Sequence, residues 1–253
     1  MKDVLLSARD LCKQFSQGTG KEQVLKNIDV DIYEGDYTVI MGSSGAGKST
    51  LLYALSGMDN ITGGKVLYKG EEISRYKERQ MALLRSREFG FVFQQTHLVS
   101  SLSLVENVAV AGYLDSGKDT KTVRQKAEKL LSRMGVEKAK DRFPSEVSGG
   151  EAQRAAIARA VINEPGLLFA DEPTGALNKR STDEVLGLLT ELAGNGQSIL
   201  MVTHDVRAAV RGTGILYLED GKILDEMSMG VYRETEAKER EKRLSEWLSD
   251  LSW

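Results

Sequence analysis

The sequence predicts an α/β fold into which a helical subdomain is inserted, and three observations support this prediction. An apolar, β-branched run at 36–41 leads into a glycine-rich turn and then into a helix at 49–55. Two further apolar runs, at 167–170 and 198–202, end in polar residues, as buried strands of a parallel sheet often do. Residues 96–165 instead carry apolar residues at helical spacing, so this segment is expected to be helical.

The other elements follow in chain order from the same patterns. Before the turn, short strands are expected at 4–6, 24–32 and 38–41. After it come an edge hairpin at 63–70, a charged helix at 78–87 and a strand at 89–95. Helices are expected around the apolar positions 123, 127, 130, 131 and 134, and at 152–162 and 181–192. A hairpin at 215–224, turning at Asp220-Gly221, ends this series.

The chain after residue 230 differs in character. Residues 234–243 are almost all charged, and Leu244, Trp247, Leu248 and Leu251 then form one stripe at helical spacing. We expect one domain over 1–230, with its helical subdomain at about 96–165, followed by a charged amphipathic helix over 231–253. The stripe can pack on the body of the same chain or on a partner, and the sequence favours neither.

Composition excludes several classes of protein. The chain has 253 residues, enough for a substantial core, and its formal net charge of -3 gives no support to nucleic-acid binding. Cys12 is the only cysteine, which excludes an internal disulfide and favours a reducing, cytosolic compartment. No apolar run approaches the length of a membrane span, so we expect no direct membrane insertion. Any membrane role must come through a partner.

The glycine-rich turn fits a phosphate-binding loop. It matches G-x-x-x-x-G-K-[ST] through Gly42, Gly47, Lys48 and Ser49. In such a loop small residues let backbone N–H groups point at a phosphate, and the helix start adds the positive end of its dipole. The lysine supplies a charge for the β- and γ-phosphates, and the hydroxyl can ligate Mg²⁺. An ordinary Gly- and Ser-rich turn is the alternative, but the flanking strand and helix argue against it. The loop residues are Gly42, Ser43, Ser44, Gly45, Ala46, Gly47, Lys48, Ser49 and Thr50.

Two adjacent carboxylates follow the apolar strand at 167–170. Asp171 is suited to hold Mg²⁺, and Glu172 can polarise an attacking water. An Asp-Glu pair is often only a solvated turn. Because a buried strand precedes this pair in a chain with a phosphate loop, we expect a catalytic role.

Three further sites leave alternatives open. Ser148 can cap a helix whose amides Gly149 and Gly150 leave accessible, and an ordinary capped helix start explains this pattern equally well. His204 follows the strand at 198–202 and can bind a γ-phosphate or make a local turn contact. Phe15 lies just before a loop, and on its own it is explained as a minor aromatic residue of the core.

Together these motifs resemble the ATP-binding cassette (ABC) ATPases, over about residues 5–224 and in the family's order. The matching segments are Phe15 (the aromatic that stacks on adenine), 42–50 (Walker A), Gln94 (Q-loop), 147–151 (signature), 167–172 (Walker B with the catalytic glutamate), 175–178 (D-loop) and His204 (switch histidine). The resemblance implies a P-loop NTPase core of mainly parallel sheet, with an antiparallel β subdomain and the inserted α-helical subdomain.

The resemblance also implies a mechanism with ATP and Mg²⁺. Two cassettes would form an ATP-dependent homodimer, with each ATP between the 42–50 loop of one chain and Ser148, Gly149 and Gly150 of the other. Lys48 would hold the phosphates, and Glu172 would orient the attacking water. Gln94 would sense Mg²⁺ and nucleotide, and His204 would hold the γ-phosphate. The metal ligands would be Ser49, Gln94 and Asp171.

A finer resemblance rests on the phrases at 90–95, 169–175 and 201–205. They are similar to the branch that serves lipoprotein release, macrolide export and peptide resistance, which also includes cell-division ATPases. The chain would then hydrolyse ATP at the cytoplasmic face of the membrane and power a separate permease with a large extracytoplasmic domain. The alternatives are a cassette that gates an extracytoplasmic activity in signalling or cell division, and a soluble nucleic-acid-linked ATPase. Neither the net charge nor a zinc site in the sequence supports the nucleic-acid-linked ATPase.

Two motifs depart from the family pattern. Glu151 stands where the signature usually has glutamine, a change that should be tolerated, and Val147 stands where it usually has leucine. Asn178 stands where the D-loop usually has aspartate, which removes a charge. We expect hydrolysis to survive with altered coupling between the two sites of a dimer.

Overall fold

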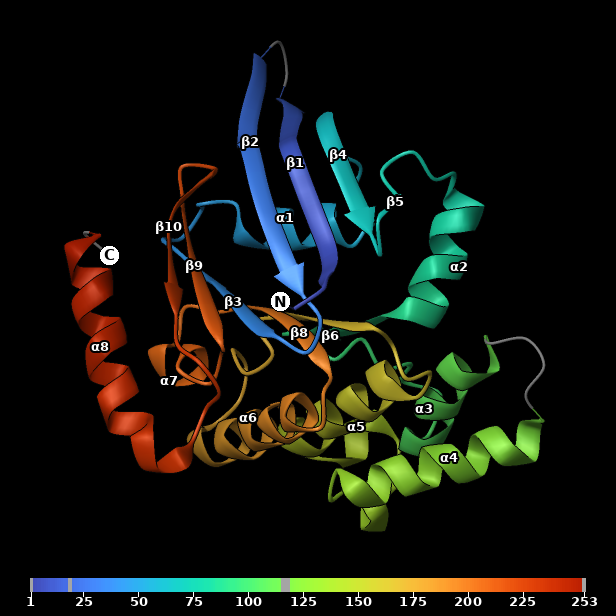
Figure 1. The fold of residues 1–253 in the computed structure, drawn as a ribbon. Helices are drawn as coiled ribbons and strands as arrows, with labels where there is room; N and C mark the ends of the chain where they lie inside the picture. Colours follow the sequence, from blue (N-terminus) through green and yellow to red (C-terminus); the bar gives the residue numbers. More distant parts are fainter. Residues whose placement is uncertain (1, 18–19, 115–118, 252–253) are drawn as a thin grey trace. The chain divides into compact units, whose positions relative to one another are not determined.

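The computed structural model describes residues 2–17, 20–114 and 119–251 (Figure 1). Trp253, which ends the predicted tail, lies outside the described residues. The chain divides into two compact units. Unit 1 comprises residues 1–81 and 193–253, and unit 2 comprises residues 82–192. The helices α2 (Glu78–Glu88) and α6 (Lys179–Gly194) contain the two boundaries.

Unit 1 contains an antiparallel sheet in the order β2-β1-β4-β5. Its strands are β1 (Val4–Gln17), β2 (Gly20–Tyr33), β4 (Gly63–Tyr68) and β5 (Glu71–Glu72). The strand predicted at 4–6 is therefore too short. The pairing of β1 with β2 shifts register between Ala8 and Leu11, and Asp10 there has a φ of 49°. Because such bulges interrupt the apolar alternation, the sequence pattern stops where the strand continues.

A second set of strands in unit 1 carries the phosphate loop. β3 (Tyr37–Met41) lies between the parallel strands β8 (Ser198–Val202) and β9 (Gly214–Glu219), and every residue of β3 and β8 is buried. β10 (Lys222–Ser228) pairs antiparallel with β9, which confirms the predicted hairpin. The helix α1 (Lys48–Leu55) follows the loop and contacts β8 and β1, while the short α7 (Val206–Ala209) follows β8.

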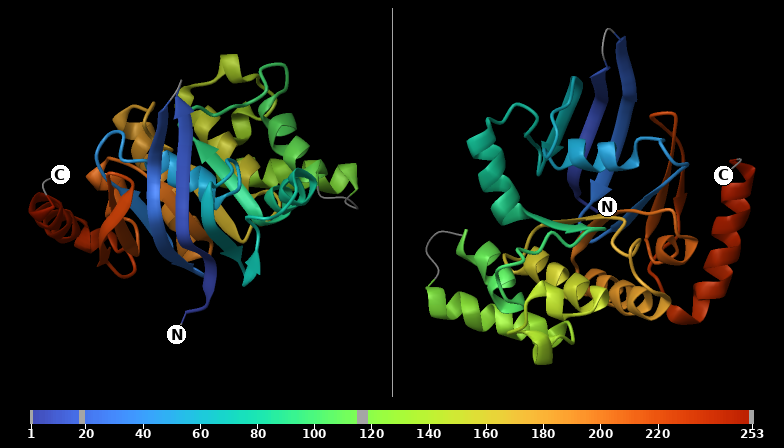
Figure 2. Two further views of the ribbon diagram at one scale, coloured as in Figure 1. Left: turned by 90° about the horizontal axis from the view of Figure 1, so that it is seen from above. Right: turned by 180° about the vertical axis from the view of Figure 1, so that it is seen from behind.

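The C-terminal segment packs on unit 1. It forms a short 3₁₀ turn, η3 (Glu234–Glu236), and then α8 (Ala237–Asp250), which lies beside the β9–β10 hairpin in the views of Figures 1 and 2. Arg240, Leu244 and Leu248 of α8 are at most 3% exposed. Of the two alternatives for the apolar stripe, packing on the body of the same chain is therefore the one that occurs.

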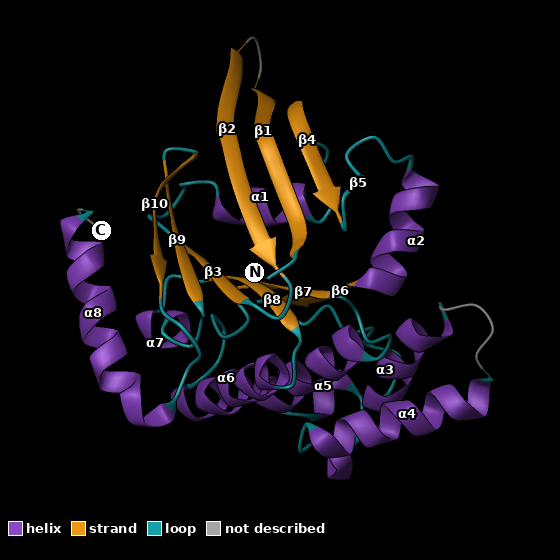
Figure 3. Ribbon diagram, viewed as in Figure 1, coloured by secondary structure: helices purple, strands orange, loops and turns teal. Residues whose placement is uncertain are grey.

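Unit 2 joins a pair of parallel strands to the predicted helices (Figure 3). Its strands are β6 (Phe89–Phe93) and β7 (Leu167–Asp171), and its helices are α3 (Leu104–Tyr113), α4 (Thr120–Arg133) and α5 (Gly149–Val161), with short 3₁₀ turns η1 (Glu137–Ala139) and η2 (Pro144–Glu146). α3 packs against α4 and α5, and α5 packs against β6. Val123, Ala127 and Leu131 are buried, as their spacing predicts.

The α/β class is confirmed, since parallel strands, an antiparallel sheet and a helical segment all occur. None of the helices formed by the described residues is long and apolar enough to cross a membrane.

Candidate functional site

The phosphate loop is held by close backbone contacts. Gly42 has a φ of 150°, and a Cβ atom there would lie 1.9 Å from the carbonyl oxygen of Leu218 on β9. Gly47 precedes α1 in the left-handed conformation, at φ 100° and ψ 15°, and no side chain caps this helix. The first N–H groups of α1 point toward the loop, where a phosphate can accept from them. The loop thus has glycines in the left-handed region at Gly42 and Gly47 and runs directly into a helix, as the G-x-x-x-x-G-K-[ST] pattern predicts.

Lys48 lies folded over this loop. Its Nζ donates to the carbonyl oxygens of Gly42, at 2.9 Å, and Ser43, at 2.7 Å. The ammonium group therefore lies against the first residues of the loop, where a phosphate oxygen can accept from it. Ser49, one residue on, is half-buried in the first turn of α1.

His204 lies at the same edge of the sheet as the loop. Val202 of β8 pairs with Ile40 of β3, and the Thr203 N–H donates to the carbonyl oxygen of Ile40 at 3.2 Å. Gly42 and His204 therefore each follow closely on neighbouring parallel strands, and His204 is exposed. Unit 1 brings the predicted loop and the predicted histidine together.

Phe15 is on β1 and is 40% exposed, so it is not a core aromatic. The Lys13 ammonium lies 4.8 Å from the centroid of its ring. Lys13 also contacts Asp59 at 2.6 Å, just beyond the end of α1. The ring is held from one side and remains accessible to a stacking base.

In unit 2, Gln94 and Glu172 lie at the same edge of the sheet because each follows one of two paired parallel strands. Phe93 of β6 pairs with Asp171 of β7, and each predicted residue follows its strand directly. A Cβ at Gly175 would lie 2.9 Å from the Gln94 side chain, so the D-loop also reaches this point. Asp171 and Glu172 are both half-buried.

The backbone at Glu172 is strained. Its φ of 46° is in the left-handed region, which is uncommon for a residue other than glycine or asparagine. Such conformations cluster at functional sites, because surrounding contacts must maintain them.

Gln153 is a residue of this site that the sequence did not single out. It is 1% exposed, and its Nε2 donates to the carbonyl oxygens of Phe93, at 2.9 Å, and Pro173, at 2.8 Å. It thus joins the backbone just before Gln94 to the backbone just after Glu172. A polar residue among the alanines of α5 was the available signal.

Ser148 caps α5 in a reciprocal arrangement with Glu151. The Glu151 N–H donates to Ser148 Oγ at 3.3 Å, and the Glu151 carboxylate accepts from the Ser148 N–H at 2.8 Å and from its Oγ–H at 2.7 Å. Gly150 is needed for packing, since a Cβ there would lie 2.5 Å from Ser181 Oγ at the start of α6. The capped-helix alternative is therefore correct as a description of this chain, and a second role would require a partner.

The predicted residues fall into two groups. Residues 42–50, Phe15 and His204 belong to unit 1, whereas Gln94, 148–150, Asp171 and Glu172 belong to unit 2. Within each group the structure brings together the residues that follow paired strands.

Comparison with known proteins identifies the chain. A family model described as "ABC transporter" matches residues 25–175, more than half of its length. The chain belongs to the ABC transporter family. It is accordingly an ATP-binding cassette that hydrolyses ATP, with the P-loop fold of that family.

Individual ABC proteins resemble the chain over most of its length. It is 38% identical over 227 residues to the bacitracin export ATP-binding protein BceA of Halalkalibacterium halodurans, covering 89% of each chain. A dimeric structure of the ATP-binding cassette MJ0796 bound to ADP and Pi is 32% identical, covers 90% of this chain and 100% of that one, and has a TM-score of 0.84. The structure of cbiO1 from Clostridium perfringens, part of the transporter complex cbiONQ, is 28% identical, covers 96% and 94%, and has a TM-score of 0.80.

The stability that Ser148 and Glu151 give to the start of α5 should depend on pH. Hydrogen bonds from Ser148 lower the pKa of Glu151 in the folded protein. The carboxylate therefore stabilises the folded state fully above its unfolded pKa of about 4.3, and this stabilisation is lost as the pH falls through the lower folded value. We expect Glu151→Gln to reduce the melting temperature near pH 7 and to have a smaller effect below pH 4. A difference in melting temperature that stays constant with pH would contradict this assignment.

The D-loop asparagine of the cassette can be tested separately. Asn178 Oδ1 accepts from the Ser181 N–H at 3.0 Å and so caps α6. Aspartate caps equally well, so Asn178→Asp should keep the fold and add only a charge. We expect a change in the Hill coefficient for ATP hydrolysis with an unchanged melting temperature. Unaltered turnover together with unaltered cooperativity would show that the charge has no part in coupling.

Proposed function

We propose that this chain is the ATP-hydrolysing subunit of an export or resistance transporter and powers a separate membrane permease with a large extracytoplasmic domain. The observation that carries the proposal is the 38% identity to a bacitracin export ATP-binding protein, which extends over 89% of both chains. The tail helix α8 packs on unit 1, so no other domain is needed to bury its apolar stripe. The conversion is ATP + H₂O to ADP + phosphate.

In this proposal the loop residues 42–50 hold the phosphates of ATP. The oxygens of ATP replace the Gly42 and Ser43 carbonyls as acceptors for Lys48. The amides at the start of α1 bind the same charge. Phe15 stacks on the adenine, and His204 contacts the γ-phosphate from the neighbouring strand end.

Glu172 is the proposed general base. It orients a water in line with the γ-phosphate and accepts its proton as the new P–O bond forms and the bond to ADP breaks. Gln94 and Gln153 support this position, because Gln153 fixes the backbone on both sides of it. Ser148, Gly149 and Gly150 serve the ATP bound to a second copy of the chain, as the dimeric structure of MJ0796 makes reasonable.

The donor set fits Mg²⁺. The proposed ligands Ser49, Gln94 and Asp171 offer a hydroxyl, a carboxamide and a carboxylate, which are the oxygen donors that this ion prefers. No cluster of three or more His, Cys, Asp or Glu side chains occurs among the described residues. When bound, Mg²⁺ neutralises charge on the β- and γ-phosphates.

The permease places the chain at the cytoplasmic face of the membrane as a peripheral subunit. The experiment is to recover the tagged, intact chain from detergent-solubilised membranes and to identify what accompanies it. A permease with few membrane helices and a large outer domain supports the proposal. A chain that stays in the soluble fraction without a membrane partner contradicts it.

The adenine platform gives a quantitative test. Phe15→Ala removes the exposed ring, and base–aromatic stacking contributes about 1–3 kcal/mol per base in other nucleotide sites. We expect ATP to bind roughly 5- to 150-fold more weakly, with little change in kcat at saturation. Phe143→Ala, which removes a 44% exposed ring in unit 2, is the matched control. Equal ATP affinities for Phe15→Ala and the parent chain would exclude stacking.

A further inference from the structure

The turn between β9 and β10 makes hydrogen bonds with the phosphate loop. The Glu219 carboxylate, at the end of β9, accepts from Ser43 Oγ–H at 2.8 Å and from the Ser43 N–H at 3.3 Å. Gly221, two residues on, donates its N–H to the carbonyl oxygen of Ala46 at 3.2 Å. The hairpin therefore contacts the loop near its start, at Ser43, and in its middle, at Ala46, and the Leu218 carbonyl lies directly against Gly42.

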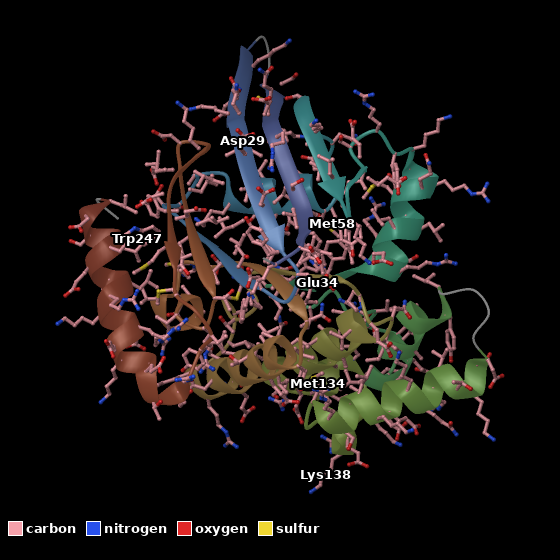
Figure 4. The ribbon with its side chains drawn as sticks, viewed as in Figure 1. Asp29, Glu34, Met58, Met134, Lys138 and Trp247 are labelled. Atoms are coloured by element: carbon pink, nitrogen blue, oxygen red, sulfur yellow. The ribbon has the colours of Figure 1, made fainter. Side chains whose placement is uncertain are left out.

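The same hairpin is held from the other side by α8. Trp247, labelled in Figure 4, donates its Nε1–H to the Asp225 carboxylate of β10 at 2.9 Å. Its ring packs edge-on against Tyr217 of β9, with centroids 6.2 Å apart. The Tyr217 hydroxyl in turn donates to Glu219 at 3.4 Å. A continuous set of contacts thus runs from α8 to the phosphate loop.

Arg240 fixes the base of the hairpin. It is 3% exposed and donates only to backbone carbonyls, on the segments just before β9 and just after β10. The accepting residues and distances are Val210 (2.8 Å), Gly212 (2.6 Å), Met229 (2.7 Å), Gly230 (3.2 Å) and Val231 (3.4 Å). A buried guanidinium needs hydrogen-bond acceptors, and buried carbonyl groups need donors. Arg240 therefore ties α8 to both ends of the hairpin.

We propose that α8 is a positioning element for the ATP site, and that Glu219 is the positioning residue through which it acts on the phosphate loop. The proposal rests on the role of residues 42–50 as the phosphate site. A loop held in its binding shape loses less conformational freedom when ATP binds, so its affinity for ATP is higher. The chemical step depends on other residues, and its rate at saturating ATP does not depend on this support.

The test is a double-mutant cycle in the full-length chain. Glu219→Ala removes the acceptor for Ser43, and Trp247→Ala removes the contact of α8 with the hairpin. We expect about tenfold weaker ATP binding for Glu219→Ala and a smaller loss for Trp247→Ala. If both act along one route, the double variant is weakened by less than the product of the two factors. Throughout, kcat at saturating ATP stays close to the parent value.

Lys242→Ala is the matched control, because this side chain is also on α8 but is 75% exposed. It should bind ATP as the parent chain does. Trp247→Ala with a lowered melting temperature but unchanged ATP affinity would overturn the proposal, since α8 would then serve stability alone. Tighter binding by Glu219→Ala would also overturn it, because the carboxylate would then act by repelling phosphate. Failure of the parent chain to bind ATP would instead refute the proposed function of residues 42–50.

Discussion

The Glu172→Gln variant is expected to bind ATP and to lose steady hydrolysis. The amide has the shape of the carboxylate but cannot accept the proton of the attacking water, and a general base contributes roughly 10²–10⁴-fold to rate. We expect kcat to fall by at least about 100-fold with ATP affinity retained. Size-exclusion chromatography with ATP should then show a trapped dimer, because the nucleotide that joins the two copies is not consumed.

Glu164→Gln is the control for this experiment. Glu164 also has a left-handed backbone, at φ 53°, and lies in a turn of unit 2 before β7. The chemical change is the same, so any effect of losing a carboxylate at a strained position appears in both variants. Rapid turnover by Glu172→Gln would remove this residue from the catalytic role.

The Gly42→Ala variant is expected to damage both the fold and the ATP site. Its methyl group would lie 1.9 Å from the Leu218 carbonyl oxygen, at a backbone conformation that side chains rarely adopt. Since β3 and β9 are paired strands of the core, neither can move aside without losing hydrogen bonds. We expect a loss of about 3 kcal/mol or more in the free energy of unfolding, measured by denaturant unfolding, and no measurable ATP binding.

The Gly35→Ala variant distinguishes the steric contact with Leu218 from the cost of the backbone conformation. Gly35 has a φ of 71°, yet no atom lies within 4 Å of where its Cβ would be. Only the left-handed conformation opposes this substitution, at about 1–2 kcal/mol, and ATP affinity should be unchanged. If the two variants lose the same stability, the contact with Leu218 does not constrain the loop.

Local motifs made much of the site predictable. The glycine pattern at 42–50 and the apolar strand before Asp171 each carry their own structural context, so their positions at strand ends follow from the sequence. The pairings of Ile40 with Val202 and of Phe93 with Asp171 then place His204 and Gln94. Those pairings join residues far apart in the chain, and no local pattern states which strands are neighbours.

The residues that were missed act through backbone atoms. Gln153 and Arg240 bind carbonyl groups, which every residue has, so nothing in the sequence marks their partners. The length of β1 was missed because bulges break its alternation, and the packing of α8 was undecided because an apolar stripe does not identify the surface that it covers. Glu219 reads as an ordinary residue beside an Asp-Gly turn.

The left-handed backbone at Glu172 bears on the history of the chain. Glycine or asparagine would suit that conformation better, so drift under selection for folding alone would tend to replace the glutamate there. Glu164 keeps the same conformation in a turn to which no role is assigned, so the backbone alone does not mark a catalytic residue, and the carboxylate itself must supply any reason to keep a glutamate at position 172.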